Sequence, residues 1–134
     1  MQHPVYAILL SGSDGDIQLP LLLWMKERLS AEGVDYIDHI ALPEIEKKII
    51  AGNQVITDAI NYSLNNHYAQ TIAIAGHAIL DIEEDARESE EQIKQRVISA
   101  AKLLVNDEWQ RPVLGLFIDQ YSQVELIFDS EKNI

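Results

Sequence analysis

Val5-Tyr6-Ala7-Ile8-Leu9-Leu10 is a continuous apolar run, and Ser11-Gly12-Ser13-Asp14-Gly15-Asp16 follows it with small, polar and acidic residues. A second apolar run, Thr71-Ile72-Ala73-Ile74-Ala75, changes in the same way at Gly76-His77. Short continuous apolar runs are typical of parallel strands that are buried on both faces. Segments with helical spacing of apolar residues lie between the runs, as in βαβ units. The sequence therefore predicts an α/β fold with a mostly parallel central sheet.

The rest of the chain continues this alternation of strands and helices. One helix is expected from Pro20 onward, ending at Gly33, and a second is expected after Pro43. A third is expected from an N-cap at Thr57, and a fourth after the capping box Ser89–Gln92. We predict about four to five strands with helices on both faces, the last two strands forming an antiparallel hairpin at one edge. The expected strands are Val5–Leu10, Val34–Leu42, Ile72–Ala75, Pro112–Asp119 and Gln123–Asp129. Because no linker or internal repeat is found, residues 1–134 are expected to form one domain.

Composition excludes several classes of function. The formal net charge is −12, from 22 acidic and 10 basic residues, which argues against nucleic-acid and anionic-membrane binding because both need Lys and Arg. The chain has no cysteine, which excludes disulfides, thiolate metal sites and thiol catalysis. No apolar run approaches the ~20 residues of a membrane span, and Val5–Leu10 lacks the features of a signal peptide. We therefore expect a cytoplasmic protein. The acidic stretch Asp81–Glu91 is interpreted as a solvated loop.

Candidate site residues follow the two strands that open into polar corners. Asp14 and Asp16 come after the first strand, and His77 comes after the strand Ile72–Ala75. In a parallel sheet the carboxyl ends of neighbouring strands converge on one crevice, where ligands bind. Asp14, Asp16 and His77 are therefore expected to face one pocket. Structural roles are the competing interpretation: turn formation or helix capping for the aspartates, and a packed, hydrogen-bonded histidine.

The same residues resemble a known family. Gly12 to Gln18 is similar to the Cys-x-Asp-x-Arg loop of the β-class carbonic anhydrases, in the short variety that runs Cys-x-Asp-Gly-Arg-x-Gln-x-Pro. The resemblance extends over roughly the whole chain and implies the β-carbonic-anhydrase fold. The matching residues and segments are Asp14, Gly15, Ile17, Gln18, Pro20, Trp24, Gly33–Asp38, Ile72–His77, Leu114–Ile118 and Val124–Glu125.

The resemblance implies a zinc site, and this sequence departs from it. The family binds zinc through the loop cysteine, the histidine and a second cysteine in His-x-x-Cys. Those three places read Gly12, His77 and Leu80, and the arginine that pairs with the loop aspartate reads Asp16. Glycine and leucine supply no ligand, and a catalytic zinc usually needs three protein ligands. Zinc is therefore not expected as a cofactor here.

Two main hypotheses of function follow. The first is a non-catalytic member of the family, a pseudoenzyme that acts as a binding or structural module for an unknown small-molecule ligand. The resemblance implies a homodimer, to which the helix after Pro20 would contribute. The second is a metal-dependent hydrolase or lyase in which Asp14, Asp16 and His77 hold Mg²⁺ or Mn²⁺. A serine nucleophile at Ser11 or Ser13 with His77 and Asp14 is a weaker alternative.

Overall fold

Five strands form one sheet in the order β2-β1-β3-β4-β5 in the computed structural model. The structure describes residues 4–29, 34–78 and 88–132. β1 pairs in parallel with both β2 and β3, and β3 pairs in parallel with β4. Only the β4–β5 pair is antiparallel, which confirms the expected C-terminal hairpin at one sheet edge. The strands are β1 (Val5–Ser11), β2 (Val34–Ala41), β3 (Ile72–His77), β4 (Val113–Ile118) and β5 (Val124–Asp129).

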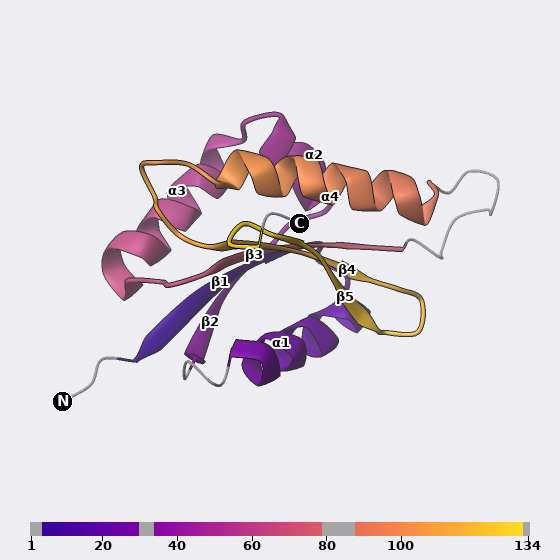
Figure 1. The fold of residues 1–134 in the computed structure, drawn as a ribbon, viewed down its shortest axis with the longest axis horizontal. Helices are drawn as coiled ribbons and strands as arrows, with labels where there is room; N and C mark the ends of the chain where they lie inside the picture. Colours follow the sequence, from indigo (N-terminus) through magenta and orange to yellow (C-terminus); the bar gives the residue numbers. More distant parts are fainter. Residues whose placement is uncertain (1–3, 30–33, 79–87, 133–134) are drawn as a thin grey trace.

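Helices cover both faces of this sheet, so the predicted α/β architecture is confirmed. α1 lies below the sheet, and α2, α3 and α4 lie above it (Figure 1). α3 continues directly into a π-helical turn, η2, before β3 begins. The helical elements are α1 (Gly15–Leu29), α2 (Ile45–Ile50), α3 (Gln54–Tyr62), η2 (Ser63–His67) and α4 (Glu90–Leu104).

The two faces of the sheet bury two separate hydrophobic clusters. On the upper face, Ile8, Leu10 and Ile74 pack with side chains of α2, α3 and α4. On the lower face, Ala7 and Leu9 pack with residues of α1. Neighbouring residues of a strand point to opposite faces, so a strand that is buried on both sides reads as an unbroken apolar run. This is the physical reason that β1 and β3 were recognisable in the sequence.

The start of α1 differs from the sequence-based expectation. We expected the helix to begin near Pro20, but it begins at Gly15 and Pro20 lies inside it. An internal proline removes one backbone hydrogen bond and is usually avoided there. Ile17 and Leu21 are four residues apart and are both buried under the sheet. Their packing holds the turn around Pro20 in helical form, so tertiary contacts override the local preference of proline.

The N-caps were predicted with mixed success. The capping box before α4 is confirmed: Gln92 N donates to Ser89 Oγ at 3.2 Å, and Ser89 N donates to Gln92 Oε1 at 3.0 Å. The N-cap at Thr57 is wrong, because α3 begins at Gln54 and Asn53 caps it. Asn53 Oδ1 accepts hydrogen bonds from Val55 N at 2.9 Å and Ile56 N at 3.3 Å.

The predicted acidic loop lies only partly within the residues that the structure describes. Residues 81–87 of the predicted acidic loop lie outside the described residues, as does Gly33, the predicted end of the first helix. Glu90 and Glu91, expected in that acidic loop, instead form the first turn of α4. Across the described ranges, none of the helices has the length and apolar content needed to traverse a bilayer.

Candidate functional site

The two polar corners predicted to converge do lie together at the carboxyl ends of the parallel strands. β1 ends at Ser11 and β3 ends at His77. The backbone of Gly12 approaches the His77 ring so closely that an added Cβ would lie 2.7 Å from Cε1 and 3.2 Å from Nδ1. Real Cβ atoms are essentially never that close to a neighbour. The absence of a side chain at Gly12 is therefore what allows the imidazole to take this position.

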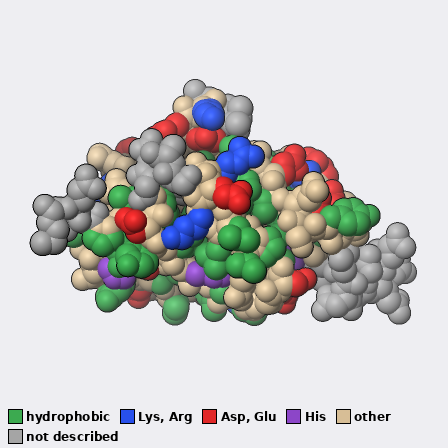
Figure 2. Space-filling view, turned by 90° about the horizontal axis from the view of Figure 1, so that it is seen from below, with side chains coloured by type: hydrophobic (Ala, Val, Ile, Leu, Met, Phe, Trp, Pro, Cys, Tyr) green, Lys and Arg blue, Asp and Glu red, His purple; other side chains and the backbone are tan. Residues whose placement is uncertain are grey.

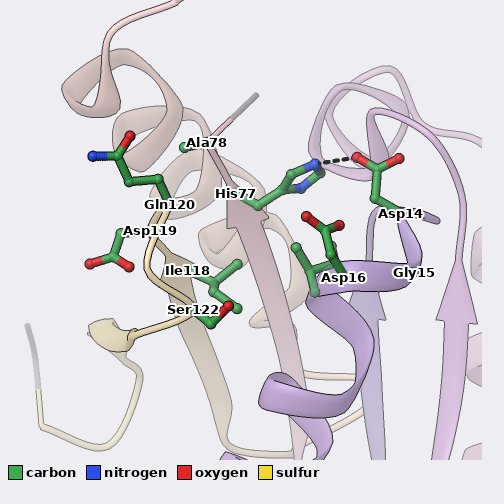
Figure 3. Close-up of a pocket in the computed structure, with 10 residues that line it drawn as sticks. Asp14, Gly15, Asp16, His77, Ala78, Ile118, Asp119, Gln120 and Ser122 are labelled. Carbon is green, nitrogen blue, oxygen red and sulfur yellow. Dashed lines mark hydrogen bonds and ion pairs between the residues drawn. The ribbon is translucent and has the colours of Figure 1, made fainter. Parts of the chain in front are cut away.

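A hydrogen bond to Asp14 also holds the His77 ring. His77 Nε2 lies 2.9 Å from Asp14 Oδ2 (Figure 3). A carboxylate accepts hydrogen bonds and does not donate them, so the proton between the two atoms belongs to Nε2. The His77 side chain is 16% exposed and that of Asp14 is 64% exposed. A pair this open to water adds little stability, and its main effect is to orient the ring.

A cavity of about 320 Å³ opens beside this pair. Asp14 approaches it from the corner before α1 and Asp16 from the first turn of α1, while Asp119 and Gln120 lie across from them on the β4–β5 turn (Figure 3). All three predicted site residues, Asp14, Asp16 and His77, line this one cavity. The other lining residues are Gly15, Ile17, Ala78, Ile118 and Ser122.

The charged side chains that line the cavity, among the described residues, are acidic. Three carboxylates, those of Asp14, Asp16 and Asp119, line it, and no Lys or Arg is among its described lining residues. One carboxylate oxygen of Asp119 is used within the β4–β5 turn, because Oδ1 accepts hydrogen bonds from Tyr121 N at 2.8 Å and Gln123 N at 3.0 Å. Carboxylates around a concave site repel anions. The cavity therefore suits a neutral or cationic molecule better than an anion such as bicarbonate.

The described residues do not fit the zinc site that the resemblance implies. Gly12 has no side chain, and the space that a side chain there would use is filled by His77. Leu80 lies outside the described residues. Within residues 4–29, 34–78 and 88–132, no three or more His, Asp or Glu side chains are grouped as a metal site would require. Of the corner residues that the structure describes, only His77 and the two aspartates carry an imidazole or carboxylate group.

The Ser11 alternative also finds no support in the geometry. Ser11 is fully buried, and its Oγ donates to Gly12 O at 2.9 Å. The same Oγ lies 2.6 Å from His39 Nε2 on β2. With the hydroxyl proton directed to Gly12 O, His39 Nε2–H donates to Ser11 Oγ. Ser11 is therefore paired with His39 rather than with His77. This pair links β2 to the end of β1, directly before Gly12.

His39 is a residue whose role near the site the sequence did not indicate. Burial lowers the pKa of His39 because the charged imidazolium loses water there. The neutral ring is therefore favoured in the folded protein. Asp119, Gln120 and Ser122 were missed as well, although they follow a strand end in the same way as Asp14 and His77 do. Applying the same convergence rule to β4 would have found them.

Comparison with known proteins gives the same fold and identifies the family. The model of a family described as "Putative carbonic anhydrase" matches residues 2–128. Among solved structures, a tetrameric β-carbonic anhydrase from the filamentous ascomycete Sordaria macrospora matches with a TM-score of 0.60 and 16% sequence identity. That match covers 94% of this chain and 81% of the other chain. No curated protein matches the chain. Since the family model spans nearly the whole sequence, the chain belongs to this carbonic-anhydrase family and has the β-carbonic-anhydrase fold.

Proposed function

We propose that this protein keeps the fold of its family without its zinc chemistry, and acts as a binding module whose small-molecule ligand enters the Asp14–His77 cavity. The observation that carries the proposal is the position of the His77 ring. It lies over Gly12, where the family has a cysteine ligand, and its Nε2 is bonded to Asp14. A catalytic zinc needs about three protein ligands and an open position for water. In such sites the zinc ion lowers the pKa of the attacking water toward about 7, so a site that does not hold zinc loses this activation.

The metal content of the protein tests this proposal. Protein purified without chelators is expected to contain far less than one zinc per chain and to show no hydration of carbon dioxide above the uncatalysed rate. Elemental analysis by mass spectrometry and stopped-flow hydration assays measure the two quantities. A zinc-binding β-carbonic anhydrase purified in the same way is the control. Stoichiometric zinc in this protein would overturn the proposal.

The second candidate, a hydrolase or lyase with a carboxylate metal site, rests on Asp14, Asp16 and His77 lining one cavity. It is less favoured, because the described residues contain no group of three ligands in position to hold an ion. It predicts that Mg²⁺ or Mn²⁺ raises the melting temperature and that Asp14→Ala removes the rise. We expect no rise, and a rise that depends on Asp14 would replace the first candidate with the second.

We further propose that the protein is a homodimer, joined at the face that carries α1. On the described part of this face α1 is the one helix, and hydrophobic side chains form several patches there (Figure 2). Leu19 and Leu23 lie one turn apart on α1 and are 63% and 51% exposed, which is unusual for a pair of neighbouring leucines on one helix face. They line a groove of about 360 Å³ that continues to Val124 at the start of β5. A second copy placed here would cover these apolar side chains.

Substitution on α1 distinguishes this interface from other surfaces. Sedimentation equilibrium is expected to give the mass of a dimer for the unmodified protein and that of a monomer for Leu23→Glu. Leu103→Glu is the matched control, because Leu103 is 57% exposed on α4, on the opposite side of the sheet. A monomeric unmodified protein, or a Leu23→Glu variant that stays dimeric, contradicts the proposal. The cytoplasmic location and the absence of nucleic-acid binding stay predictions from the sequence.

A further inference from the structure

A second cavity lies at the β2 edge of the sheet and shares no lining residue with the Asp14–His77 cavity. Its volume is about 360 Å³, within the range of small-molecule sites. One wall is the edge strand β2, from Asp38 to Ile40, and the other is formed by α3 and η2, with Ala59, Tyr62, Ser63 and His67. β2 is the terminal strand of the sheet, so this cavity lies at the edge of the sheet opposite β5.

Asp38 organises the polar part of this cavity. Its Oδ2 accepts a hydrogen bond from Ser63 Oγ at 2.5 Å and lies 2.7 Å from His67 Nδ1. Because a carboxylate only accepts, the proton of the imidazole is on Nδ1. In the neutral ring the lone pair is then on Nε2, which becomes a hydrogen-bond acceptor. The Asp38 and His67 side chains are 26% and 31% exposed, so both can be reached from solvent.

Aromatic contacts fix the orientation of the His67 ring. Tyr6 of β1 stacks on it with ring centres 4.3 Å apart and an interplanar angle of 19°. Tyr62 contacts it edge-on, with centres 5.7 Å apart and an angle of 85°. Both partners of Asp38 come from the π-helical turn η2, a type of turn that is often found at functional sites. The ring is therefore held by two neighbours and one hydrogen bond before any ligand arrives.

We propose that this cavity binds a small, flat aromatic molecule that carries one hydroxyl or N–H donor. The donor bonds to His67 Nε2, and the ring of the ligand lies against the apolar wall made by Ile40, Ala59 and Tyr62. His67 Nε2 and the Asp38 carboxylate supply hydrogen-bond acceptors beside an apolar wall, and ligand sites combine apolar walls with a few placed polar groups. The competing interpretation is that the Asp38–His67 pair only fastens η2 to β2.

Phenol and toluene distinguish the two interpretations, because they have similar shapes and only phenol has a donor. We expect phenol to bind saturably at millimolar concentration and to shift the His67 nitrogen signals in two-dimensional NMR spectra at pH 8. Toluene is expected to bind about 2- to 10-fold more weakly, which corresponds to one net hydrogen bond. This comparison uses the unmodified protein, so it does not depend on the folding of a variant.

Two variants locate the binding. His67→Phe keeps an aromatic ring for Tyr6 and Tyr62 but has no nitrogen, and it is expected to remove the preference for phenol over toluene. Asp14→Ala, in the other cavity, is expected to leave phenol binding unchanged. Equal binding of phenol and toluene overturns the proposal. So does the absence of saturable binding, or a phenol affinity that responds to Asp14→Ala and not to His67→Phe.

Discussion

Replacing Leu21 with alanine is expected to lower the free energy of unfolding by about 2–5 kcal/mol. Leu21 is fully buried between α1 and the lower face of the sheet, where it packs in the same cluster as Leu9 and Leu116. Removing its side chain loses apolar burial and leaves a cavity that its neighbours fill only in part. Because α1 is the one helix of the described chain on this face, the effect is expected near the upper end of the range.

Urea denaturation followed by circular dichroism measures this change, and Leu103→Ala is the matched control. Leu103 is also inside a helix, α4, but it is 57% exposed. The chemical change is identical in the two variants, and only burial differs. Leu103→Ala is expected to change the free energy of unfolding by less than about 0.5 kcal/mol. Equal losses in the two variants would mean that α1 is not packed on the sheet as described.

Replacing Gly76 with alanine is expected to destabilise the protein by about 1–3 kcal/mol through overpacking. Gly76 lies in β3 directly under α4. An added Cβ would be 2.5 Å from Val97 Cγ2 and 3.0 Å from Ile93 Cγ2. These methyl groups belong to short, branched side chains on a packed helix, so they have little room to move away. α4 would have to shift away from the sheet to accept the new methyl group.

The origin of that loss can be tested with two further variants in the same urea experiment. Gly15→Ala is the control, because no atom lies within 4 Å of the Cβ that it would add. It is expected to leave stability unchanged or to raise it by up to about 1 kcal/mol. Adding Val97→Ala to Gly76→Ala removes the nearest methyl group, so the double variant should lose less than the sum of the single losses. Strict additivity would show that contact with Val97 is not the cause.

Much of the fold could be predicted from the sequence, because burial on both faces leaves a clear pattern. β1 and β3 were recognisable as unbroken apolar runs, and β4 and β5 as two runs joined by a short turn. The errors lie where distant contacts decide local structure. Ile17 and Leu21 keep Pro20 within α1 by packing under β1 and β3, and nothing near Pro20 in the sequence reveals this.

In the candidate site, too, the features that depend on the strand pattern could be predicted, and those that depend on distant contacts could not. The convergence of Asp14, Asp16 and His77 could be predicted, because it depends only on strand direction and on the position of each residue after its strand. The pairings Ser11–His39 and Asp38–His67 could not, because each joins residues 28 or 29 positions apart whose meeting depends on register and on where η2 ends. The contact between Gly12 and the His77 ring depends on side-chain orientation, which the sequence pattern does not contain.

The crowding at Gly12 constrains how this corner can change over evolutionary time. Any substitution there meets the imidazole first, since even one extra carbon atom would lie 2.7 Å from it. The histidine would have to rotate, and it would then give up its bond to Asp14. Because that pair is open to water, losing it removes little stability. A larger residue at Gly12 would therefore act mainly on the position of the imidazole, and the glycine and the histidine are coupled in how this corner can change.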